Sequence, residues 1–262
     1  MQHAMDVNSD VGESFGNYAF GADAEIMPHL SSANVACGFH AGDPVHMERT
    51  VQLAKQHGVA VGVHWGLPDI AGFGRREINI STDEARCLTL YQIGALRQIA
   101  DSVGATIDHL VPHGALYPML AKNDAIAGAM IDAINRVDAG WVLYWPTPLE
   151  RHRFYEIARA EGIRIVHELC IDLEYRCDGS LIVERQKRRV DPGRVADRLE
   201  RFIRDRKLRT VDDTDLEFDA QAILVHGDGP NAADVVRAVR QTLERLQVSV
   251  RPASTLVGAP RQ

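Results

Sequence analysis

The 262-residue sequence predicts an α/β barrel, on two observations. Short runs rich in valine, isoleucine and alanine alternate with longer amphipathic segments along the chain, as in a parallel sheet with helices outside it. Six of these runs lead into an acidic or histidine side chain, namely Asp10, His40, His64, His113, Asp172 and His226. In a closed barrel such strand ends meet at one face, whereas an open doubly wound sheet gathers them mainly at one switch point. We therefore expect the closed form.

Buried strands are predicted wherever a short β-branched run is bounded by glycine or polar residues. These runs lie at Met5–Val7, Ala33–Cys37, Val59–Val63, Ile107–Val111, Trp141–Trp145, Ile163–Cys170, Gln221–Val225 and Val248–Val250. A hairpin is expected between Leu173 and Glu184, because Asp178-Gly179 is a typical two-residue turn.

The predicted helices carry recognisable start signals. Asp23 is expected to cap one helix, and Asp43 to cap another that begins at Pro44. Ser81 and Glu84 have the spacing of a capping box. The predicted helices lie at Asp23–Leu30, Pro44–His57, Ser81–Val103, Asp124–Val137, Leu149–Glu161, Asp191–Arg206 and Pro230–Leu246.

Composition restricts the class of protein. The net charge of −7 argues against general binding to nucleic acid or to an anionic membrane. The four cysteines form no CxxC pair, and neither a signal peptide nor an apolar run of about 20 residues is found. We expect a cytoplasmic protein with no nucleic-acid or membrane partner. No linker or repeat is found, which favours one domain over residues 1–262.

The segment Asn8–Glu13 has two interpretations. Asp10 is a candidate base or metal ligand with Asn8 as its hydrogen-bonding partner, or the segment is an ordinary polar turn. The turn at Gly38–Asp43 is clearer, since Asp43 is expected to cap a helix and His40 has no such structural role. We assign His40 to chemistry.

Histidines follow three further strands, at His64, His113 and His226. One such histidine is usually structural, but four at equivalent strand ends favour a shared function. None has a local metal-binding spacing, so a metal site would have to be assembled from distant positions.

Two further pairs of charged residues bear on function. Arg76 and its neighbour Arg75 lie in the long glycine-rich loop 65–80, and an arginine fork suits a carboxylate-bearing substrate. His226 and Asp228 form a candidate acid–base pair, although Asp228 could instead cap the next helix. No phosphate-binding glycine loop and no GxSxG serine motif is present.

Several longer motifs carry a family resemblance that spans nearly the whole chain. They are VNSDVGESFG, SSANVACGFHAGDP, GVHWGLPDIAGFGRR, LYQIGAL, PHGALY, DGSL and VHGDGPNA. In this order they resemble the LamB/YcsF family, which includes the A subunit of 5-oxoprolinase. The resemblance implies a distorted (β/α) barrel of the glycoside hydrolase/deacetylase type. It also implies ATP-dependent hydrolysis of 5-oxo-L-proline to L-glutamate, with ATP used through the partner subunits B and C.

Four positions depart from the family pattern. Val111 replaces a lysine, Leu173 replaces an arginine, and Trp65 and Pro118 stand where the family commonly has proline and asparagine. Two cations are thereby lost near the expected mouth of the barrel. A divergent paralogue acting on another lactam or amide is one interpretation, and a chain that has lost activity is another.

The preferred function is therefore the A subunit of an ATP-dependent, 5-oxoprolinase-like lactam hydrolase. Asp10 with His40 or His113 is expected to activate water, while His64 and His226 act on the developing charge. The expected substrate-binding residues are Asn8, Asn34, Arg76, Asp172 and Asp228. The alternatives are a stand-alone metal-dependent deacetylase or amidohydrolase, with the metal on Asp10, His64 and His113, and a non-catalytic regulatory or binding protein. A homo-oligomer is compatible with the sequence.

Overall fold

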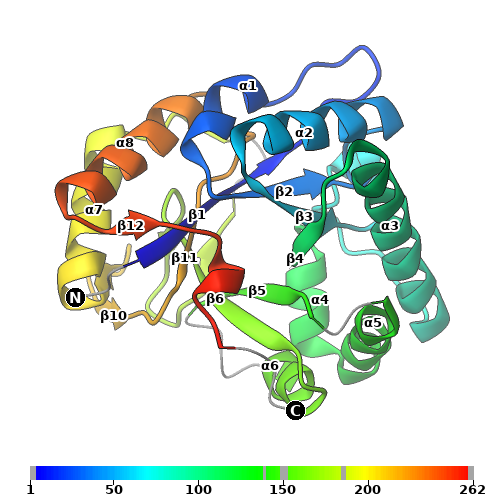
Figure 1. The fold of residues 1–262 in the computed structure, drawn as a ribbon. Coiled ribbons are helices and arrows are strands. Elements are labelled where there is room, and N and C mark those ends of the chain that lie inside the picture. The colour runs from blue at the N-terminus through cyan, green and yellow to red at the C-terminus, as the bar shows by residue number, and fades with distance from the viewer. Residues whose placement is uncertain (1–3, 138–139, 148–152, 184–186, 259–262) are drawn as a thin grey trace.

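The protein folds into a closed seven-stranded parallel barrel (Figure 1). This computed structural model describes residues 4–137, 140–147, 153–183 and 187–258. The barrel strands, in spatial order, are β1 (Ala4–Val11), β2 (Ser32–Ala36), β3 (Ala60–Trp65), β4 (Ile107–Pro112), β5 (Val142–Pro146), β6 (Arg164–Cys170) and β11 (Ala222–Leu224). The barrel closes where Asp6–Asn8 of β1 pairs with Ala222–Leu224, and the prediction of a closed α/β barrel is confirmed.

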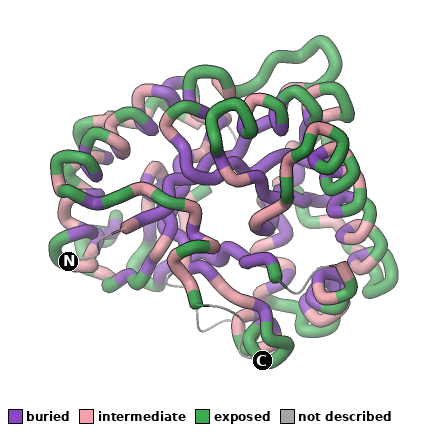
Figure 2. Tube along the Cα trace, viewed as in Figure 1, coloured by how far each residue is buried: buried purple, intermediate pink, exposed green. Residues whose placement is uncertain are grey.

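Helices form a ring outside the strands, and the strands are buried while the outer helix faces are exposed (Figures 1 and 2). They are α1 (Asp23–Ile26), α2 (Pro44–His57), α3 (Thr82–Val103), α4 (Leu116–Lys122), α5 (Asp124–Val137), α6 (Arg153–Ala160), α7 (Pro192–Asp205) and α8 (Ala232–Arg245). Short 3-10 turns lie at Met27–His29, Ile70–Gly72 and Ala253–Thr255. Within the described residues, no helix is long and apolar enough to cross a membrane.

Most predicted helix boundaries are confirmed. Asp43 caps α2 by accepting hydrogen bonds from the backbone of the first turn, and Ser81 and Glu84 form the capping box of α3. The prediction for Asp23 was wrong. Ala22 occupies the N-cap position of α1, and the Asp23 carboxylate instead accepts a hydrogen bond from the Gly12 backbone at 2.8 Å.

The connecting segments hold elements that the sequence pattern did not reveal. Helix α4 overlaps the end of the PHGALY motif, and β9 (Lys207–Arg209) pairs with β10 (Asp215–Glu217) as a small hairpin. The predicted hairpin between Leu173 and Glu184 is present as β7 (Glu174–Tyr175) and β8 (Leu181–Ile182). The predicted start of the helix at Leu149 lies outside the described residues.

One side of the barrel interior is polar rather than apolar. Asp6 is fully buried and accepts hydrogen bonds from Ser31 at 2.6 Å, Ser32 at 2.7 Å and Tyr144 at 3.1 Å. Asn8 also donates to Asp6, at 3.2 Å. Buried polar groups are tolerated when they are hydrogen-bonded, so this network holds β1, β2 and β5 in one arrangement.

We predict that Gly227→Ala destabilises the fold. A Cβ atom at Gly227 would overlap the carbonyl oxygen of Asp10, which belongs to β1 and cannot move aside easily. The expected loss is about 1–3 kcal/mol of unfolding free energy, the usual range for overpacking. Chemical denaturation would measure it. Gly229→Ala is the matched control, because its Cβ meets nothing closer than 3.6 Å. Equal stability of the two variants would contradict this packing.

Candidate active site

Four titratable side chains converge at the carboxyl end of the barrel strands. Ligand atoms of Glu13, His40, His64 and His113 all lie within 4.8 Å of one another, and all four residues are buried. His64 is the next-to-last residue of β3 and His113 follows β4 directly, while His40 and Glu13 come from the loops after β2 and β1. Parallel strands deliver their C-terminal loops to the same end of a barrel, and three of the six side chains predicted to meet there, His40, His64 and His113, lie together in this cluster.

His64 and His113 are each anchored to a backbone carbonyl. His64 Nδ1 lies 3.0 Å from the Val111 carbonyl oxygen, and His113 Nε2 lies 2.7 Å from the Phe73 carbonyl oxygen. A carbonyl can only accept, so both of these ring nitrogens donate. The two remaining nitrogens, His64 Nε2 and His113 Nδ1, face each other at 2.9 Å.

The long loop after β3 packs closely against these rings. A Cβ atom at Gly66 would collide with the His40 ring, and one at Gly74 would collide with His40 and His113. Gly74 also has a φ of +62°, a conformation that favours glycine. The His40 ring stacks on the His113 ring with centroids 3.8 Å apart. The glycines of this loop therefore serve close packing over the histidines.

Burial sets the charge of the cluster. It lowers the pKa of His40 and of His113 well below the usual range, and neighbouring histidines lower both further. Burial also raises the pKa of Glu13 well above its usual value, with the charges of Asp10 and Asp228 adding to the effect. Among the described residues, neither ring nitrogen of His40 nor Oε1 of Glu13 has a hydrogen-bond partner.

Asp10 lies beside the cluster and is held by Asn34. The Asp10 Oδ1 atom is 3.5 Å from His64 Nε2 and accepts a hydrogen bond from Asn34 at 3.0 Å. Asn34 also donates to Asn8 at 2.8 Å, and its Oδ1 atom accepts a hydrogen bond from His109 at 2.8 Å. Asn8 and Asn34 are fully buried. These hydrogen bonds let the two residues position Asp10, while direct contact with a substrate stays a prediction.

A second group of charged residues lies beside β6 and β11. His226 Nδ1 is 3.0 Å from the Asp172 carboxylate, and Lys187 Nζ is 2.9 Å from Asp228. Asp228 also pairs with Arg75 at 2.7 Å.

Asp228 does not cap α8, since Asn231 occupies that position. The alternative of a helix cap for Asp228 was wrong.

Arg75, rather than Arg76, contacts the charged group beside β6 and β11, through its ion pair with Asp228. The Arg75 side chain is 13% exposed, whereas that of Arg76 is 55% exposed and forms an ion pair with Asp69. Asp69 itself is bonded to the Gly72 backbone within the same loop. Arg76 therefore stabilises the loop that covers the histidines, and its predicted contact with a substrate finds no support in this geometry.

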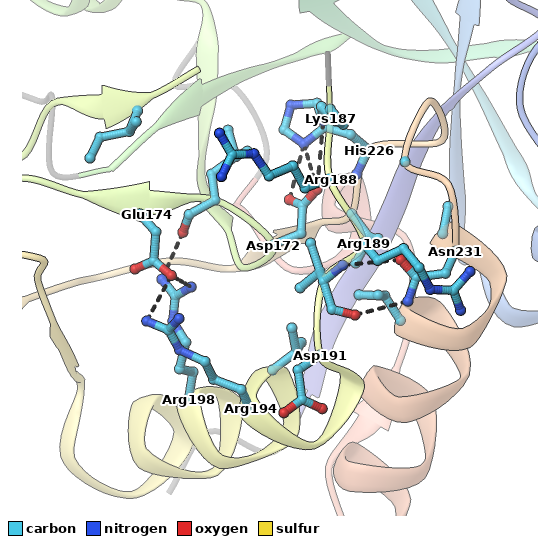
Figure 3. Close-up of a pocket in the computed structure, with 18 residues that line it drawn as sticks. Asp172, Glu174, Lys187, Arg188, Arg189, Asp191, Arg194, Arg198, His226 and Asn231 are labelled. Carbon is cyan, nitrogen blue, oxygen red and sulfur yellow. Dashed lines mark hydrogen bonds and ion pairs between the residues drawn. The ribbon is translucent and has the colours of Figure 1, made fainter. Parts of the chain in front are cut away.

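A cavity of about 400 Å³ opens next to His226 (Figure 3). Asp172, Lys187 and His226 meet at one side of it, while Arg194 and Arg198 approach Glu174 at the other. Five basic residues line the cavity, Lys187, Arg188, Arg189, Arg194 and Arg198, and they outnumber the three acidic ones, Asp172, Glu174 and Asp191. The volume suits a small ligand, and the excess of positive charge suits an anion.

Three contributors to the site were missed from the sequence. Glu13 was hidden in a polar segment that is also typical of a turn, and Arg75 could not be told from its neighbour. Lys187 belongs to a basic stretch without periodicity. Lys187 and Arg75 supply cations near the mouth, although the positions of Val111 and Leu173 are buried and apolar. Two cations are thus present beside Asp172 and Asp228, although the two family positions themselves carry none.

The arrangement can transfer protons and bind an anion. The Asp172 carboxylate orients the His226 ring, which is the geometry of an acid–base pair. His226 lines the cavity, so its other ring nitrogen can reach a ligand there. Three imidazoles and two carboxylates in and beside the buried cluster are, in addition, typical ligands for a metal ion.

Comparison with known proteins shows which family the chain belongs to. The model of the LamB/YcsF family matches residues 5–258. The chain belongs to the LamB/YcsF family. It is 41% identical over 256 residues to the 5-oxoprolinase A subunit of Pyrococcus abyssi, covering 97% of this chain and 99% of the relative. It is 43% identical to the 5-oxoprolinase A subunit of Shouchella clausii, covering 95% of this chain and 98% of the relative.

Solved structures show the same fold. A lactam utilization protein from Thermus thermophilus superposes with a TM-score of 0.86 at 39% identity, covering 95% of this LamB/YcsF chain and 99% of that one. A GH113 β-1,4-mannanase superposes with a TM-score of 0.56 at 10% identity, covering 93% and 99%. The second likeness concerns the barrel alone and bears out the glycoside hydrolase type of fold.

We predict that the Asp172–His226 pair contributes to the free energy of unfolding near neutral pH and that this contribution falls in acid. Burial alone would raise the pKa of Asp172, but the charges of His226 and Lys187 outweigh it, and the pKa lies below its usual value. A depressed carboxyl pKa stabilises the fold above the unfolded value of about 3.9, and this contribution is lost as pH falls below it. The stability advantage of wild type over Asp172→Asn should therefore be larger at pH 6 than at pH 3.

Urea denaturation at a series of pH values would measure this difference. Asp132→Asn, on the exposed face of α5, is the control and should follow the wild-type pH dependence. An advantage over Asp172→Asn that stays constant between pH 6 and pH 3 would show that the pair does not depress this pKa.

Proposed function

We propose that this chain is the A subunit of an ATP-dependent 5-oxoprolinase, which opens the lactam ring of 5-oxo-L-proline to give L-glutamate. The observation that carries this proposal is the full-length match, at about 40% identity, to proteins named as the A subunit of 5-oxoprolinase. The cationic cavity beside an acid–base pair supports it, because 5-oxoproline is a small carboxylate. We infer one LamB/YcsF-like domain over residues 1–262.

The same relatives also support the proposal that this chain uses ATP and works with partner subunits. The relatives are named as one part of an enzyme with several subunits, and we propose that the others are subunits B and C. The chain has no phosphate-binding glycine loop, so ATP would be used together with these partners. The four cysteines are free. Free thiols and use of ATP both suit a cytoplasmic enzyme.

The proposed reaction activates the lactam before water attacks it. The γ-phosphoryl group of ATP passes to the lactam oxygen and ADP leaves. Water adds to the ring carbon, the C–N bond breaks and the nitrogen takes up a proton. A second water then releases phosphate and leaves glutamate. A base near the attacking water and an acid near the leaving nitrogen are the two groups that this sequence of steps requires.

Two groups in the mouth suit these roles. Asp10 is a carboxylate held by Asn34 beside His64, and we assign it to water activation together with the buried histidines. His226 lines the cavity with its Nδ1 bonded to Asp172, and we assign its other nitrogen to the leaving amine. Lys187 lines the cavity and shares Asp228 with Arg75, and we assign these two cations to the substrate carboxylate, which would replace Asp228 as their partner.

A stand-alone amidohydrolase is the second candidate, and the buried histidine–carboxylate cluster favours it. Such an enzyme would hydrolyse an amide without ATP and without other subunits. Dependence on ATP therefore separates the two functions.

We predict that this chain, mixed with its B and C partners, forms glutamate from 5-oxo-L-proline only when ATP is present. His226→Gln should lower kcat/KM by about 100-fold or more, the usual contribution of a positioned acid or base. His167→Gln, at a partly exposed histidine earlier on β6, should retain wild-type activity. Glutamate formation without ATP would favour the amidohydrolase, and no glutamate under any of these conditions would refute the proposed function.

We further predict that Arg75 and Arg76 differ in their effect on catalysis. Arg75→Ala removes a partly buried cation from Asp228 and should lower kcat/KM by roughly 10- to 100-fold, since hydrogen bonds to charged groups contribute about 1.5–3 kcal/mol. Arg76→Ala removes a half-exposed ion pair and should change it little. Steady-state kinetics of the two variants would decide. A larger effect from Arg76→Ala would restore Arg76 as the substrate-binding arginine.

A further inference from the structure

The hydrogen bonds of His64 and His113 leave too few protons for the contact between them. Each ring donates one nitrogen to a carbonyl oxygen, that of Val111 or of Phe73. A neutral imidazole carries one proton, so the two nitrogens that face each other are then bare. Two lone pairs at 2.9 Å repel, and the contact requires something positive between or beside them.

A single proton shared by His64 and His113 would make this contact favourable, but it would leave other polar atoms nearby without a partner. His40 and Glu13 also end in buried atoms without a hydrogen-bond partner among the described residues, and His40 Nε2 lies 3.8 Å from Glu13 Oε1. Asp10 adds a second carboxylate at 3.5 Å from His64. Unpaired buried polar groups are costly, and several of them at one point indicate a ligand that all of them contact.

We propose that this cluster binds one divalent transition-metal ion of the zinc type through His64 Nε2, His113 Nδ1, His40 and Glu13. Three nitrogens and one carboxylate oxygen are ligands that zinc and its neighbours prefer. Metal-bound histidines usually donate their other ring nitrogen to a carbonyl or carboxylate, which is the arrangement of His64 and His113. The ligand set differs from the Asp10, His64 and His113 set expected from the sequence, because the ligand atoms of Glu13 and His40, and not those of Asp10, fall in the group that lies within 4.8 Å.

The four ligands are not equivalent. His64 and His113 are fixed by their carbonyl partners, and their 2.9 Å separation is close to the roughly 3.4 Å between two tetrahedral ligands of zinc. The His40 ring is parallel to that of His113, so it must tilt before both ring planes can contain one ion. Among the described residues, no hydrogen bond opposes that tilt. His64 and His113 should therefore contribute more to affinity than His40.

Bound there, the ion would polarise a carbonyl or lower the pKa of a water molecule. The proposed metal site is inferred only from the side chains of this chain and does not depend on the proposed function. Its test therefore needs neither 5-oxoproline nor partner proteins. It can fail while the lactam-opening activity is present, or succeed while that activity is absent.

Titration of the chelator-treated chain with Zn²⁺ and with Co²⁺ tests the proposal. We expect one ion per chain by elemental analysis and visible Co²⁺ absorption typical of nitrogen ligands. His64→Gln and His113→Asn should each weaken binding by about 100-fold or more, above the usual effect of losing an outer-shell partner. His40→Gln should weaken it less. His57→Gln, at an exposed histidine at the end of α2, is the control for binding at the surface and should bind as wild type.

Thermal unfolding keeps the test decisive if a variant is less stable. The ion should raise the Tm of wild type and of His57→Gln, and raise that of folded His64→Gln far less. Three results would overturn the proposal. They are the absence of stoichiometric binding by wild type, equal affinity of wild type and His64→Gln, and a strongly deshielded N–H proton shared by His64 and His113 that persists when Zn²⁺ is added.

Discussion

Strand β1 pairs with both β2 and β11, and this double pairing closes the barrel. Asn8 takes part in both pairings, opposite Ser32 on one side and Leu224 on the other. Closure satisfies the backbone hydrogen bonds of the first and last barrel strands and leaves neither as an open edge. It also brings the loop that carries His226 against Asp10, although the two residues lie near opposite ends of the sequence. The site exists because the barrel closes.

The polar interior follows from the same pairing. A buried carboxylate such as Asp6 is costly unless its oxygens are hydrogen-bonded, and the neighbouring strands supply those donors. Asn34 extends the network by donating to Asn8 and Asp10. Gly62 leaves room for the His109 ring, since a Cβ there would collide with it. The network thus connects the barrel interior to the base of the site and fixes where Asp10 points.

Strands and helices could be predicted well because their signals are local. The α2 boundaries at Pro44 and His57 follow from a capping aspartate, a proline and a glycine, all within or next to the helix. The longer sequence motifs also predicted the LamB/YcsF family and, through it, the barrel fold.

The partners of charged side chains could not be predicted in this way, because they are decided by contacts between distant segments. Arg75 and Arg76 have the same local surroundings, yet one reaches Asp228 and the other Asp69. Glu13 and Lys187 became site residues only once the loops were placed.

If barrel closure joins side chains of distant strands into one catalytic unit, His64 on β3 and His226 after β11 should act together. A double-mutant cycle can decide this, with kcat/KM of the complex measured for wild type, His64→Gln, His226→Gln and the double variant. Residues that act as a unit show strongly non-additive losses. We expect the double variant to be little worse than the more damaged single variant. Losses that simply multiply would show that the two histidines act independently and that closure does not join them into one unit.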